Sequence, residues 1–62
     1  MNEYKGYRGS FEWSEEDQVF WGRILDIDDL VTYESKDKML LVTEYHKAVD
    51  DYIAFKQGVG KA

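Results

Sequence analysis

The stretch LVTYESKDKMLLVTEY, residues 30–45, contains the change of pattern that decides the fold. Up to Ser35 it reads as a short strand, LVTYE, rich in β-forming side chains. Beyond Ser35 the apolar positions follow a helical period, because Leu41, Tyr45 and their successors lie three or four residues apart. The stretch therefore predicts a strand that leads directly into an amphipathic helix.

The predicted helix carries one apolar stripe. The stripe continues through Ala48, Tyr52 and Phe55, and is widened by Val42, Val49 and Ile53. Asp37 or Ser35 can cap its start, since a short side-chain oxygen accepts a hydrogen bond from a free backbone N–H of the first turn. Gly58 and Gly60 supply a stop, and the tail 58–62 has the composition of a frayed end. We expect this helix to pack on one face of a sheet.

Two further strands are predicted upstream. Apolar and polar or small residues alternate over 4–13, and VFWGRIL, residues 19–25, is rich in β-formers. The polar run 14–17 suits a turn between them, and the acidic stretch 26–29 turns the chain into the third strand. The expected fold is α+β, a three-stranded antiparallel meander with one C-terminal helix on one face.

The short chain favours association. Its 62 residues make one domain, placed at 1–62 and structured over about 4–57, whose core alone leaves little net stability. The absence of cysteine excludes disulfides and thiolate zinc sites. Because apolar side chains point to both faces of residues 19–25, we expect a homodimer or higher oligomer with Trp13 and Trp21 in its interface. Leu40 is an apolar group on the polar side of the helix, explained by that interface or by local fraying.

The charge balance bears on partners and location. Thirteen acidic residues against eight basic ones give a net charge of −5. Such a chain binds nucleic acid phosphates weakly, so we expect no direct DNA binding. A basic protein is the better electrostatic match. No apolar run approaches the roughly 20 residues of a membrane span, and the N-terminus lacks the apolar core of a signal peptide. We expect a cytoplasmic protein without membrane contact.

Three polar groups of the helix are candidates for chemistry. His46, Asp50 and Asp51 lie among apolar residues in HKAVDDYIAF. Adjacent helical positions differ by about 100°, so the two aspartates cannot share a metal without a ligand from the sheet. Lys47 precedes them by three and four residues, the ordinary arrangement of a solvated helix face. The pattern favours a packed histidine and surface carboxylates over a catalytic or metal site.

Other enzyme signatures are missing from the sequence. Gly6, Gly9 and Gly22 lie inside strand patterns, where glycine marks bulges or close approaches and forms no phosphate loop. The acidic runs 15–17 and 26–29 lack the spacing of an EF-hand loop and read as solvated turns. We therefore expect no catalytic residue, no metal ligand and no cofactor.

The order of these blocks resembles a known family. YKGYRGSFEWSEEDQVFWGRIL (4–25), DLVTYES (29–35) and YHKAVDDYIAF (45–55) are similar to the HicB antitoxins, and the most specific block is 46–52 combined with 31–34 upstream. The resemblance implies an α+β domain related to a partial ribonuclease H fold. Such a domain binds and blocks a small basic messenger-RNA-cleaving toxin of the HicA type. Some members continue into a DNA-binding segment, whose promoter binding is not expected of residues 1–62.

The functional alternatives belong to different classes. The resemblance implies an interaction protein and not an enzyme; the alternatives are a small metal-dependent nuclease on a ribonuclease H-like sheet, or a drifted relative with no surviving partner. Metal-assisted phosphodiester cleavage needs several carboxylates that converge on one or two ions, and the spacing of the acidic groups does not provide them.

Binding of a basic toxin requires an acidic surface. The candidates are the two acidic turns and the helix face of Glu44, Asp50 and Asp51 with the flanking His46. We favour the helix face, because it lies in the block of strongest resemblance and a rigid helix loses less entropy on binding than a turn does.

Overall fold

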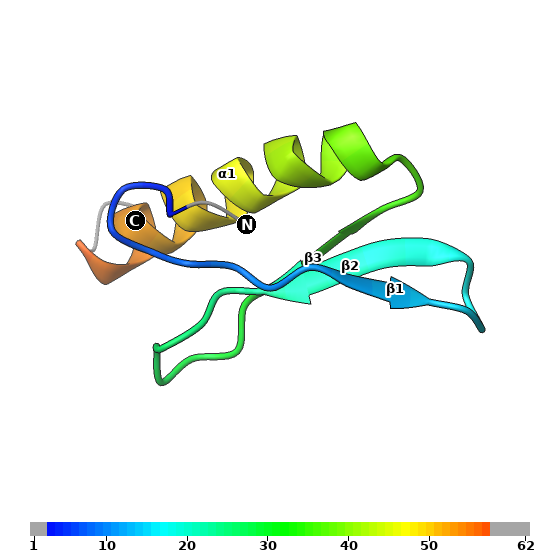
Figure 1. The fold of residues 1–62 in the computed structure, drawn as a ribbon. Coiled ribbons are helices and arrows are strands. Elements are labelled where there is room, and N and C mark those ends of the chain that lie inside the picture. Colours follow the sequence, from blue (N-terminus) through cyan, green and yellow to red (C-terminus); the bar gives the residue numbers. More distant parts are fainter. Residues whose placement is uncertain (1–2, 58–62) are drawn as a thin grey trace.

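The computed structural model describes residues 3–57 as a sheet covered on one face by a helix (Figure 1). The elements in chain order are β1 (Glu12–Ser14), β2 (Val19–Arg23), β3 (Thr32–Ser35) and α1 (Lys38–Lys56). The strands pair antiparallel in the order β1-β2-β3, so both β1 and β3 are edge strands. The expected α+β meander with one C-terminal helix is confirmed. The predicted stop at Gly58 and Gly60 and the frayed tail lie outside the described residues.

The start of α1 is fixed by Asp37. Its carboxylate accepts from the backbone N–H of Met39 at 2.8 Å and of Leu40 at 3.4 Å, with extended backbone at φ −108°. Ser35 instead accepts the N–H of Asp37 at 3.1 Å through its hydroxyl oxygen. Of the two predicted caps, Asp37 is therefore the residue that occupies the N-cap position.

The core lies between α1 and the facing side of the sheet. Its buried side chains are Ile24, Tyr33, Leu41, Tyr45, Val49 and Tyr52. The helical members fall on the stripe that the sequence predicts. Phe20 packs against this cluster, as expected for the face of β2 shared with Ile24.

The opposite face of the sheet is not covered by any described element (Figure 1). Trp21, the neighbour of Phe20 on β2, points to this face and keeps 36% of its surface exposed. Both faces of β2 therefore carry large apolar groups, as predicted.

The predicted strand over 4–13 is wrong in its first half. Tyr4 and Tyr7 exchange two backbone hydrogen bonds, of 2.8 and 2.9 Å, so the chain reverses between them. Lys5 and Gly6 between them have φ of +52° and +87°, the signs that a type I′ turn requires. Gly6 thus serves a turn and not a strand. Only after this reversal does the chain run along β2, with the Leu25 N–H donating to the Arg8 carbonyl at 2.8 Å.

Gly9 and Gly22 are sites of close approach, as the sequence predicts. A Cβ on Gly22 would lie 2.1 Å from the Ser10 carbonyl oxygen, and one on Gly9 would lie 2.2 Å from the Tyr33 hydroxyl. The Arg23 N–H donates to the Ser10 hydroxyl oxygen at 2.9 Å, and the Ser10 carbonyl instead accepts from the Tyr33 hydroxyl at 2.9 Å. The first strand therefore bends over β2, and only residues 12–14 pair regularly.

Candidate functional site

One side of α1 is covered by the N-terminal turn. The His46 ring stacks on the Tyr4 ring with centroids 3.9 Å apart and an interplanar angle of 15°. The Tyr4 hydroxyl donates to the Asp50 carboxylate at 3.2 Å, and Lys5 Nζ lies 2.8 Å from the same carboxylate. His46 and Asp50 thus hold the turn of residues 4–7 against the helix.

The electrostatics of this covered side follow from one ion pair. The hydrogen bond from Lys5 is the main cause that lowers the pKa of Asp50, and the small burial of the carboxyl opposes it. The same bond raises the pKa of Lys5. Both groups remain accessible to solvent, with side-chain exposures of 54% for Lys5 and 46% for Asp50. Because solvent screens the two charges, this ion pair contributes only modestly to the stability of the fold.

Two buried phenols anchor the same region from inside. The Tyr45 hydroxyl donates to the Tyr7 carbonyl, and burial raises the pKa of Tyr45. Burial also raises the pKa of Tyr33 to about 12, and its hydroxyl is committed to the Ser10 carbonyl. Both hydroxyls are donors to main-chain oxygens in the protonated form. Their arrangement is structural, because each proton is already engaged in a hydrogen bond that holds the segment of residues 7–10 in place.

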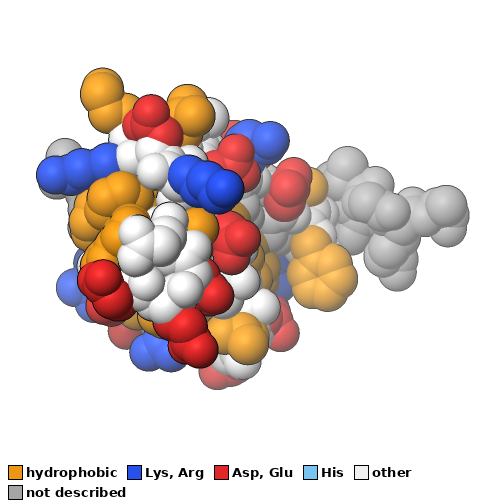
Figure 2. Space-filling model, turned by 90° about the vertical axis from the view of Figure 1, so that its right-hand side faces the viewer, with side chains coloured by type: hydrophobic (Ala, Val, Ile, Leu, Met, Phe, Trp, Pro, Cys, Tyr) orange, Lys and Arg blue, Asp and Glu red, His pale blue; other side chains and the backbone are white. Residues whose placement is uncertain are grey.

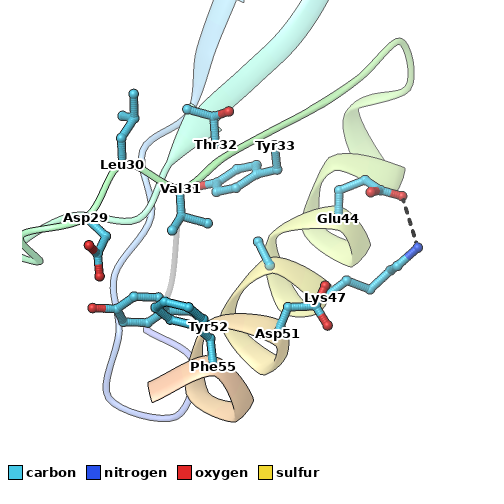
Figure 3. Close-up of a pocket in the computed structure, with 11 residues that line it drawn as sticks. Asp29, Leu30, Val31, Thr32, Tyr33, Glu44, Lys47, Asp51, Tyr52 and Phe55 are labelled. Carbon is cyan, nitrogen blue, oxygen red and sulfur yellow. Dashed lines mark ion pairs between the residues drawn. The ribbon is translucent and has the colours of Figure 1, made fainter. Parts of the chain in front are cut away.

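The other side of α1 faces an open groove of about 660 Å³ (Figure 3). One wall is formed by residues 29–33, the segment that enters β3. The other wall comes from α1. Its exposed members include Lys47, Asp51 and Phe55, and Glu44 on the same wall is half-buried. Figure 3 shows the Glu44 and Lys47 side chains directed away from the strand, joined by an ion pair of 4.0 Å.

Exposed apolar groups belong to both walls of this groove. Leu30 on the strand wall is 79% exposed and Phe55 on the helix wall is 67% exposed, while Tyr52 of α1 is buried. Burial is the main cause that raises the pKa of Tyr52, and a hydrogen bond with Asp29 adds to it. The groove therefore combines exposed hydrocarbon with the carboxylates of Asp29, Glu44 and Asp51.

The strand wall of the groove is a free sheet edge. The Ile24 N–H donates to the Val31 carbonyl at 3.0 Å, which places Val31 in a hydrogen-bonded pair with β2. In an antiparallel ladder such pairs alternate, so Tyr33 and Ser35 also turn their backbone groups toward β2. Thr32 and Glu34 consequently direct their N–H and C=O groups outward, along the open edge of β3.

The residues expected to bind a partner do not form one surface. Glu44 and Asp51 line the groove, whereas His46 and Asp50 contact the N-terminal turn on the opposite side of α1. The two sets lie on different flanks of α1, since positions 50 and 51 differ by about 100°. A single partner surface can therefore include one half of the predicted set without the other.

The residues expected in an oligomer interface also separate. Trp13 pairs with Phe20 in the register of β1 and β2 and so lies on the helix side of the sheet. Trp21 lies on the uncovered sheet face, and Leu40 is 55% exposed in the first turn of α1. Figure 2, which views the end of the molecule with the start of α1 and the β1–β2 turn, shows hydrophobic side chains in several separate places between charged ones.

Sequence reasoning missed the groove and the covering turn. Nothing in the pattern marks Tyr4 and Lys5 as partners of Asp50, and in the pair Lys5-Gly6 only Gly6 is a residue typical of a turn. Asp29, Leu30 and Phe55 come together only through the crossing of α1 over β3. The exposed apolar groups Leu30 and Phe55 have no periodic signature that separates them from core residues.

Within residues 3–57, no three histidine, cysteine, aspartate or glutamate side chains are grouped so that they could hold a metal ion. In the same part of the chain, α1 is not long and apolar enough to cross a membrane. Comparison with protein-family models, with curated proteins and with solved structures gave no match.

Proposed function

We propose that this chain is a protein-binding module of the HicB antitoxin type, which neutralises a small basic messenger-RNA-cleaving toxin of the HicA type in the cytoplasm. The observation that carries the proposal is the groove between β3 and α1. Its lining residues include the acidic residues Asp29, Glu44 and Asp51, and its strand wall is a free sheet edge. Acidic side chains around unpaired backbone groups suit recognition of a basic polypeptide.

Two further features support the proposal. The net charge of −5 favours rapid association with a basic protein. The α+β arrangement agrees with the fold that the HicB resemblance implies, and the closer relation to a partial ribonuclease H fold is part of the proposal. The module acts by covering its partner and carries out no chemistry of its own.

Self-association belongs to the same proposal. The uncovered sheet face, with Trp21 at its centre, would form the interface of a homodimer. The groove of β3 and α1 would remain open in such a dimer, because Trp21 and the groove-lining side chains of α1 lie on opposite sides of the sheet.

The test reads the open reading frames that flank this gene and takes a small basic protein encoded there into an inhibition assay. Messenger-RNA cleavage by that protein is measured against increasing amounts of the chain at several salt concentrations. We expect stoichiometric inhibition, with an association rate that falls steeply as salt is added. Undiminished cleavage in the presence of excess chain would contradict the proposal. A reaction with the chain and magnesium alone tests the nuclease alternative, which requires cleavage there.

A further inference from the structure

We propose that an extended, basic segment of the partner adds to the free edge of β3 as a fourth strand and lays alternate side chains into the groove. This inference rests on the proposed function for the basic character of the partner. The recognition mode itself follows from the described backbone and side chains. The bound segment must then be in strand conformation. Charge attraction to an acidic surface alone would not require any particular conformation.

The backbone of β3 provides the template for strand addition. Thr32 and Glu34 point their N–H and C=O groups away from β2, since Ile24 bonds to Val31 on the inner side. Natural edge strands are often protected by proline, lysine or a bulge. The segment TYES of β3 carries none of the three. An incoming strand can therefore form main-chain hydrogen bonds with both outward residues.

The groove specifies the side chains of that strand. Alternate residues of an added strand fall on the α1 side, beside Asp51 and Phe55. The groove-lining residues include three carboxylates, Asp29, Glu44 and Asp51, against the single ammonium of Lys47. Lys47 already pairs with Glu44. A segment in which lysine or arginine alternates with small apolar residues can place all its cations on the α1 side, beside these carboxylates, and its apolar residues on the opposite face of the added strand.

The same charges argue against a second copy of this chain as the occupant. Pairing β3 with β3 of another copy would bring two acidic grooves and two Glu34 side chains together, and like charges across an interface are unfavourable. Pairing β3 with β1 of another copy is a head-to-tail contact, which forms rings or open filaments. A basic segment from a different protein avoids both problems.

A short peptide with alternating lysine and valine residues is the probe, and the matched control has glutamate in place of lysine. Binding is followed by amide NMR spectra of the full chain. We expect the lysine peptide to shift the Thr32 and Glu34 amides and to slow their hydrogen exchange roughly tenfold or more. The glutamate peptide should cause neither change.

Variants separate the two sides of α1. Asp51→Lys should weaken binding of the lysine peptide by roughly tenfold, whereas Asp50→Lys, with the same change in net charge, should change it by less than about twofold. Thr32→Pro removes one outward N–H and should abolish the shifts at Glu34, with Thr32→Val as its control. If Thr32→Pro does not fold, the comparison of Asp50→Lys with Asp51→Lys still tests the strand-addition model.

Several results would overturn the strand-addition model. They are shifts confined to the Tyr4–His46 side or to the Trp21 face, equal weakening by Asp50→Lys and Asp51→Lys, and the absence of shifts at millimolar peptide. Inhibition of the basic toxin by Thr32→Pro as strong as by Thr32→Val would also overturn it while leaving the antitoxin proposal intact. Failure of the wild-type chain to inhibit the toxin would instead contradict the proposed function.

Discussion

The two sides of α1 differ although their acidic residues are neighbours in sequence. Asp50 lies 2.8 Å from Lys5 Nζ and helps to hold the N-terminal turn, whereas Asp51 lines an open groove beside the edge of β3. The difference arises because adjacent helical positions are about 100° apart and the chain covers only one of the two flanks. An acidic run on a helix is therefore not one surface. What the remainder of the chain places beside each residue decides its role.

The largest expected effect is at the residue that supports the covered side from within. Tyr45 is 1% exposed and donates to the Tyr7 carbonyl, so Tyr45→Ala should cost about 3–5 kcal/mol, by analogy with other large aromatic truncations. That is much of the total stability of so small a domain, and the variant should be largely unfolded by circular dichroism. Tyr45→Phe should lose only about 1 kcal/mol in urea unfolding. Wild-type stability of Tyr45→Ala would contradict the packing described.

The uncovered sheet face offers the second effect. Trp21→Ala should weaken self-association by roughly 2 kcal/mol or more, because aromatic anchors dominate interface energies. Trp13→Ala is the comparison, since Trp13 lies on the helix side of the sheet. Sedimentation at micromolar concentration measures both variants. A wild-type chain that sediments as a folded 7.3 kDa monomer would refute the dimer outright.

A third prediction uses pH to isolate the covered side. Lys5 lowers the pKa of Asp50 below its ordinary value of 3.8, so the carboxylate stabilises the fold above that value and loses this contribution as pH falls through the lowered pKa. Lys5, whose pKa is raised above 10.5, contributes below 10.5 and loses its contribution as pH rises through the raised value.

Asp50→Asn should therefore lower Tm modestly between these limits, and the wild-type and variant curves should converge at acid pH. Thermal unfolding followed across the acid range provides the comparison. A gap in Tm that stays constant well below pH 3.8 would show that the Lys5 contact is not the source of the difference.

The smallest expected effect is at the neighbouring aspartate. Asp51→Asn changes an exposed groove residue for which no ion pair is described, and it should alter the free energy of unfolding by no more than about 0.5 kcal/mol. Parallel urea titrations of Asp50→Asn and Asp51→Asn measure the contrast. Equal destabilisation by the two changes would remove the distinction between the sides of α1.

Local patterns were sufficient to predict much of the fold. The helical stripe from Leu41 and the short side chain of Asp37 place α1 and its cap, since both signals depend on residues within one or two turns. The meander of residues 19–35 follows from β-forming runs separated by acidic turns. The reversal at Lys5-Gly6 was missed, because the alternation of Tyr4 and Tyr7 with small or polar residues also fits a strand.

The site was less predictable because it depends on long-range placement. The helical angle separates Asp50 from Asp51 in the sequence already, but it does not say which flank the N-terminal turn covers. The groove needs the crossing of α1 over β3, which brings Phe55 and Leu30 to the two walls of one groove. Neither contact has a signature within a window of a few residues.

Amide hydrogen exchange of the free chain tests the central contrast most directly. Ile24 and Leu25 donate their N–H groups to Val31 and Arg8, at 3.0 and 2.8 Å, and should exchange slowly on both flanks of β2. Thr32 and Glu34, whose N–H groups face the open edge, should exchange at close to the rate of an unstructured chain. Exchange at Thr32 and Glu34 as slow as at Ile24 would mean that the β3 edge is already covered, and would contradict the open groove on which the proposed binding site depends.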